Sequence, residues 1–114
     1  MADSADVRTI ALGLPETTEQ PHFDMASFRI RGKIFATLPD PDHLHVMLSE
    51  EDIHAAVAEH PDICEEKWWG KRLSATRITL PRITTPLLTE LLTDAWRNKA
   101  PRTLVRAFDE NSGR

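Results

Sequence analysis

Apolar residues recur along the chain with two periods, one typical of helices and one typical of strands. Four of them near the N-terminus share one helical face: Val7, Ile10, Ala11 and Leu14. Ser4 or Asp3 precedes them as a candidate N-cap, so the spacing predicts a short helix that ends before Pro15. Residues 15–22 follow neither period, and we expect a loop there.

Alternating apolar and polar residues predict a β-hairpin over residues 26–38, turning around Gly32. A two-residue turn, Arg31-Gly32, would place Ile34 on the opposite face from Phe28. We therefore expect a three-residue turn, Ile30-Arg31-Gly32, with Gly32 in the left-handed position. That turn would gather five apolar residues on one face: Ala26, Phe28, Ile34, Ala36 and Leu38. The other face would carry Arg29, Lys33 and Phe35.

Alternation resumes over residues 43–48, which predicts a third strand with His43 and His45 facing outward. Ser49 and the three acidic residues that follow it are typical of a helix N-terminus, so we expect a helix over residues 50–59. Residues 62–72 show no regular pattern. Residues 73–80 predict a fourth strand, and a further strand before it is left open.

The longest helical stripe lies near the C-terminus and comprises Leu87, Leu88, Leu91, Leu92, Ala95 and Trp96. Thr85-Pro86 is a suitable start for this helix, and Pro101 separates it from a short last helix over 102–108. The expected fold is α+β, an antiparallel β-sheet packed against N-terminal, central and C-terminal helices. It forms one domain, residues 1–110, with a frayed tail at 111–114.

Charge is distributed unevenly along the 114 residues, whose formal net charge is −4. Residues 1–66 carry four basic and fourteen acidic side chains, whereas residues 67–114 carry ten basic and four acidic ones. Because recognition depends on local potential, the acidic total leaves a nucleic-acid partner open.

Cys64 is the only cysteine, so no internal disulfide can form. The opening Met-Ala-Asp-Ser lacks the basic and apolar regions of a signal peptide, and charges interrupt every apolar run. These features predict a cytoplasmic protein without a membrane partner.

Three kinds of chemistry lack a recognisable pattern in this sequence. Neither the set His54, His60 and Cys64 nor the alternating His43 and His45 matches a metal-ligand spacing. Two glutamates follow Cys64 and oppose thiolate formation, and the four glycines are scattered singly. We therefore expect no metal, no cofactor and no catalytic residues.

Basic side chains in two segments are candidates for nucleic-acid contacts: Arg29, Arg31, Lys33, Lys67, Lys71, Arg72 and Arg77. The first three belong to the predicted hairpin, and the others surround a tryptophan pair. If folding brings the two segments to one side, their cations could neutralise phosphates. The alternative is that they are ordinary solvated strand residues, balanced by the acidic helix at 50–59.

Trp68 and Trp69 are adjacent, so in an extended segment their side chains point to opposite sides. We expect one of them in the core and the other in a ligand pocket or a partner surface. The candidate aromatic binding surface comprises Phe35, Trp68 and Trp69.

Several segments, taken in order, resemble the MmcQ/YjbR family over nearly the whole chain. They are Gly13-Leu14-Pro15-Glu16, the hairpin from Phe28 to Ala36, Ile78-Thr79-Leu80, the helix from Leu87 to Trp96, and Lys99-Ala100-Pro101. The resemblance implies a CyaY-like α+β fold and DNA binding through a double-wing arrangement of hairpins. The family's Lys and Trp before the fourth strand correspond to Lys67 and to Trp68 or Trp69. The resemblance brings no catalytic set.

Two functions follow as hypotheses. The first is a non-enzymatic DNA-binding protein that contacts phosphates through the basic hairpin tip and the Trp/Lys/Arg segment. The alternative is a binding module for an unknown protein or small molecule, which would use the exposed aromatic surface.

Overall fold

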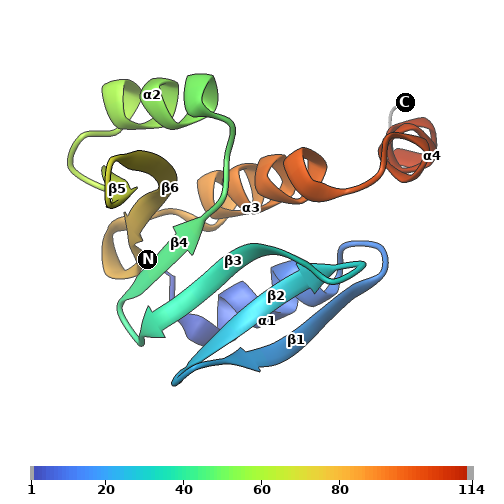
Figure 1. The fold of residues 1–114 in the computed structure, drawn as a ribbon, viewed down its shortest axis with the longest axis horizontal. Helices are drawn as coiled ribbons and strands as arrows, with labels where there is room; N and C mark the ends of the chain where they lie inside the picture. Colours follow the sequence, from blue (N-terminus) through green and yellow to red (C-terminus); the bar gives the residue numbers. More distant parts are fainter. Residues whose placement is uncertain (1, 113–114) are drawn as a thin grey trace.

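A computed structural model describes residues 2–112 of the chain, and eleven helices and strands follow one another along it (Figure 1). In chain order they are α1 (Ser4–Leu12), β1 (Thr17–His22), β2 (Met25–Ile30), β3 (Lys33–Asp40), β4 (His43–Val46), α2 (Glu50–Glu59), β5 (Cys64–Trp69), β6 (Arg72–Thr79), the 3-10 turn η1 (Leu80–Arg82), α3 (Thr85–Lys99) and α4 (Arg102–Ser112).

The six strands form one antiparallel sheet in the order β1-β2-β3-β4-β6-β5. Helices α1, α2 and α3 share a single hydrophobic core with one face of this sheet. Its largest fully buried side chains include Trp96, Phe28, Phe35, Ile30 and Leu44. Within residues 2–112 no helix packs on the other face, which we call the open face. The predicted α+β fold is confirmed.

The predicted helices begin at the caps that their sequences indicate. Asp3 accepts a hydrogen bond from the backbone N–H of Asp6 and the Asp6 carboxylate accepts one in return, so a complete capping box opens α1. Ser49 caps α2 by accepting from the N–H of Asp52. The last helix runs further than expected, through Ser112, and of the tail expected to fray, residues 113–114 lie outside the described residues.

The sequence analysis missed the strand β1 and left the strand β5 open, and both are edges of the sheet. Residues 17–22 form β1 and not a loop, and residues 64–69 form β5 in the segment that showed no pattern. An edge strand has one neighbour and buries few side chains, so its alternation is weak. The edge position also tolerates Pro21, which lacks a backbone N–H.

The β2–β3 turn differs from the expected one. Ile30 pairs with Lys33, so the turn has two residues, Arg31 and Gly32, with φ of 50° and 84°. A bulge at Phe28/Arg29 then inserts one extra residue, Phe35, into β3, so that Phe28 again lies opposite Ala36. The bulge, and not an odd-numbered turn, restores most of the predicted apolar face. Ile34 pairs with Arg29 instead, and Phe35 enters the core.

The strand directions bring two hairpin turns to the same end of the sheet. Both β3 and β6 pair antiparallel with β4, so both begin where β4 ends. The β2–β3 turn and the β5–β6 turn therefore flank the segment that joins β4 to α2. The C-terminal end of α3 reaches the same place, because Asn98 Nδ2 donates to the backbone oxygen of Met47 at 2.8 Å.

Candidate nucleic-acid interface

The seven predicted cations fall into two groups. Arg31, Lys33, Lys71 and Arg72 lie at the two hairpin turns, and with Lys99 at the end of α3 they form what we call the basic end. The other three cations lie on the open face of the sheet: Arg29, Lys67 and Arg77. The two groups do not correspond to the two sequence segments, because each hairpin contributes cations to both the basic end and the open face.

Arg31 is the one member of the basic end with an acidic partner among the described residues. Its Nε lies 2.8 Å from Glu16 Oε1 and its Nη2 lies 3.1 Å from Oε2, a two-pronged contact. This hydrogen bonding lowers the pKa of Glu16 below its ordinary value. Both residues have positive φ, 50° for Arg31 and 56° for Glu16, so the contact joins two strained turns.

The remaining cations of the basic end are free of such contacts. Within the described part of the chain the side chains of Lys33, Lys71, Arg72 and Lys99 have no hydrogen-bond or ion-pair partner. Lys71 follows Gly70, whose φ of 62° allows the tight β5–β6 turn that holds Lys71 outward. Their charge is available to an external anion.

Two of the three open-face cations, Arg29 and Arg77, are engaged with neighbouring polar groups. Arg29 donates from Nε to Ser27 Oγ at 3.1 Å and from Nη2 to the Pro21 oxygen at 3.4 Å. Arg77 Nη1 lies 3.3 Å from His45 Nε2. Lys67 sits opposite Ala75 in the outermost pair of strands. These three residues are spread over the face and do not join the basic end.

His45 occupies the middle of the open face, between Thr37 and Arg77 on the flanking strands. It faces away from the core as predicted, but only 8% of it is exposed, so the prediction of a surface histidine is wrong. Burial, and then the nearby charges of Arg77 and Lys67, lower its pKa to about 4. His45 is therefore a neutral hydrogen-bond acceptor for Arg77 at neutral pH.

The predicted aromatic surface requires two corrections. Phe35 is fully buried, because the β3 bulge turns it into the core. Neither tryptophan is in the core, since 49% of Trp68 and 75% of Trp69 is exposed. Trp68 Nε1 donates to Glu66 Oε1 at 3.0 Å, on the side of β5 that faces α2. Trp69 lies opposite Arg72 at the β5–β6 turn.

Trp69 and Arg72 line a groove of about 510 Å³ at the basic end. Its walls are the β4–α2 link, the β5–β6 turn and the end of α3, which contributes Asn98 and Lys99. The sequence analysis missed Lys99 as a site residue. Lys99 appeared there only in the Lys99-Ala100-Pro101 segment of the family resemblance, and nothing local indicated that α3 ends beside Trp69.

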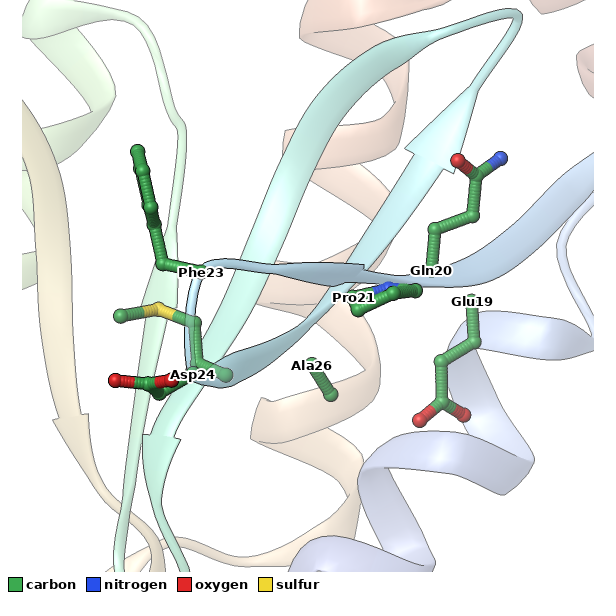
Figure 2. A pocket seen from close by; sticks show the side chains of 7 residues that line it. Glu19, Gln20, Pro21, Phe23, Asp24 and Ala26 are labelled. Carbon is green, nitrogen blue, oxygen red and sulfur yellow. The ribbon is translucent and has the colours of Figure 1, made fainter.

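A second pocket, of about 540 Å³, lies on the β1–β2 hairpin and contains none of the predicted site residues. Figure 2 shows Glu19, Asp24 and the exposed Phe23 among its lining side chains. Two carboxylates and no cation make this pocket unsuited to an anion.

Catalytic and metal chemistry receive little support from the geometry. Burial raises the pKa of the Cys64 thiol to about 11, which disfavours the reactive thiolate. Among residues 2–112, no group of three or more His, Cys, Asp and Glu side chains is arranged to hold a metal ion. No helix in the same range is both long and apolar enough to cross a membrane.

Comparison with known proteins gives a consistent picture. The model of the YjbR family matches residues 12–98. The uncharacterized proteins Rv2570 of Mycobacterium tuberculosis and Mb2600 of Mycobacterium bovis are each 31% identical to this chain over 132 aligned residues, covering 99% of this chain and 100% of theirs. The crystal structure of Deinococcus radiodurans protein DR2400, with a DUF419 domain, superposes with a TM-score of 0.76 at 20% identity, covering 97% of this chain and 88% of that one. This last likeness concerns the fold alone.

Proposed function

The chain belongs to the YjbR family, and we propose that it is a non-enzymatic DNA-binding protein that contacts phosphates through its basic end. The observation that carries the proposal is that the two hairpin turns lie at the same end of the sheet, on either side of β4. Lys33 comes from one turn, Lys71 and Arg72 come from the other, and all three lack an acidic partner among the described residues.

Unpartnered cations at one end of a sheet suit a polyanion better than a small anion. Each turn projects its charge from a rigid hairpin, and one strand, β4, separates the two hairpins. Phosphates repeat along a DNA strand, so two separate cationic turns can be neutralised together. Arg31 would join them by exchanging Glu16 for a phosphate, which the same planar guanidinium accepts.

The open-face cations take no direct part in this proposal. Arg29 and Arg77 already donate to Ser27, Pro21 and His45, so a phosphate would have to replace existing hydrogen bonds. The proposed contacts are therefore a subset of the seven residues predicted from the sequence, with Lys99 added.

A matched pair of charge reversals tests this proposal. Lys71→Glu alters the basic end, whereas Arg82→Glu makes the same change of net charge at η1, which follows the opposite end of β6. We expect a labelled duplex at low salt to bind the wild type and Arg82→Glu alike, and Lys71→Glu about tenfold or more weakly. Absence of duplex binding at low salt, or equal losses in both variants, would refute the proposal.

A further inference from the structure

The groove at the basic end combines an aromatic surface with cations. Met47 and Leu48 from the β4–α2 link and Leu73 from β6 give it apolar lining, and Ser49, Ser74 and Asn98 add polar atoms. The Asn98–Met47 hydrogen bond fixes the end of α3 against the link. Its volume of about 510 Å³ lies within the range of small-ligand sites.

Trp69 is the most exposed of the three tryptophans. Trp96 is buried, and its Nε1 donates to the Pro15 oxygen at 3.0 Å, while Trp68 is held by Glu66. The Trp69 indole N–H has no partner within residues 2–112. An exposed indole held on a paired strand can stack a planar ring without first being uncovered.

The charges around the groove favour an anion. Arg72 and Lys99 line it without acidic partners among the described residues, and the N-terminus of α2, capped by Ser49, also reaches it. One carboxylate, Glu50, lines the same groove and opposes the two cations. A ligand must therefore bring negative charge near Arg72 and Lys99 and keep it away from Glu50.

A planar aromatic ring joined to a phosphate is the chemistry of a nucleotide. We infer that the groove holds one unpaired nucleotide, with its base stacked on Trp69 and its phosphate between Arg72 and Lys99. A paired base is already stacked within its duplex, so the nucleotide comes from single-stranded DNA or is free in solution. The inference deepens the proposed DNA-binding function and rests on it where the nucleotide is part of a DNA strand.

The experiment titrates the full chain with a short oligothymidylate, with the corresponding duplex and with thymidine monophosphate, while tryptophan fluorescence is recorded. Stacking on Trp69 predicts quenching by oligothymidylate in the wild type and in Trp68→Leu. We expect Trp69→Leu to bind oligothymidylate about tenfold more weakly, with duplex affinity unchanged. Glu50→Gln should bind it more tightly, because the one opposing carboxylate is removed.

The three probes separate the possible outcomes. If the monophosphate quenches as strongly as oligothymidylate, and Trp69→Leu abolishes this quenching, the groove binds a free nucleotide. If oligothymidylate alone quenches, the groove binds a DNA strand. Equal effects of Trp68→Leu and Trp69→Leu, or no quenching by either oligothymidylate or the monophosphate, overturn the inference. Duplex binding without quenching by oligothymidylate supports the proposed function and contradicts nucleotide binding in the groove. Quenching without duplex binding refutes the proposed duplex binding and supports nucleotide binding in the groove. Near-ultraviolet circular dichroism of each variant confirms that it is folded.

Discussion

Phe35 and Trp69 both belong to the aromatic surface predicted from the sequence, but Phe35 is buried and Trp69 is exposed. Phe35 alternates with basic residues on a predicted outer face, yet the bulge in β3 buries it completely. Trp69 belongs to the tryptophan pair of which one member was expected in the core, and it remains 75% exposed at a hairpin turn. A single inserted residue in β3 therefore makes Phe35 a core side chain.

The two aromatic residues should differ sharply in their contribution to stability. We expect Phe35→Ala to lower the free energy of unfolding by about 3–5 kcal/mol, since it leaves a cavity in the core. Trp69→Ala should change it by less than about 1 kcal/mol because little of the indole is buried. Urea denaturation of both variants measures this difference, and similar losses would contradict the assigned burial.

His45 makes the stability of the fold depend on pH. Its folded-state pKa of about 4 lies below its ordinary value of 6.5, so between these values the unfolded chain binds the proton more strongly. The stability that neutral His45 provides is complete above about pH 6.5 and is lost as the pH falls toward 4. The free energy of unfolding should fall by on the order of 3 kcal/mol over this range.

Replacing His45 by Gln, which keeps a hydrogen-bond acceptor for Arg77 without titrating, isolates this effect. Denaturant unfolding at pH 7 and at pH 4.5 should show a smaller decrease in stability for His45→Gln than for the wild type. Asp40 and His43, whose charges also act on His45, are the same residues in both proteins. Equal decreases would mean that His45 does not carry the pH dependence.

At the scale of the elements, helices and central strands were predictable because their apolar residues face the core and their polar residues face away from it. The stripe of α3, the Ser49 cap of α2 and the alternation of β2, β3 and β4 all appear in the structure. The edge strands β1 and β5 bury too few side chains to produce such a pattern. The bulge at Phe35 was unpredictable because it depends on pairing between strands and not on either strand alone.

The β2–β3 turn carries an arginine where a type I′ turn favours asparagine or glycine. We expect Arg31→Asn to melt at a temperature equal to or above that of the wild type, because asparagine tolerates positive φ better. Arg31→Val, whose branched side chain tolerates it least, should melt at a lower temperature. Thermal unfolding followed by circular dichroism compares the three, and a less stable Arg31→Asn would show that the Glu16 contact outweighs the turn strain.

At the scale of the whole molecule, the order of strands explains what the charge pattern could not. The sequence placed seven cations in two segments but could not divide them between the ends and the faces of a sheet. Antiparallel pairing of β3 and β6 with β4 brings the two hairpin turns to one end, and the close of α3 adds Lys99 there. A protein with net charge −4 thus carries unpartnered cations of both hairpins at one end of its sheet.

The salt dependence of duplex binding tests the role of this basic end most directly. Neutralising about three phosphates predicts a log–log slope of binding constant against salt of roughly −3 for the wild type. The double variant Lys33→Gln/Lys71→Gln should reduce the magnitude of that slope by about 2. An unchanged slope in the double variant, measured by fluorescence anisotropy on the same duplex, would contradict phosphate binding by the two hairpin turns.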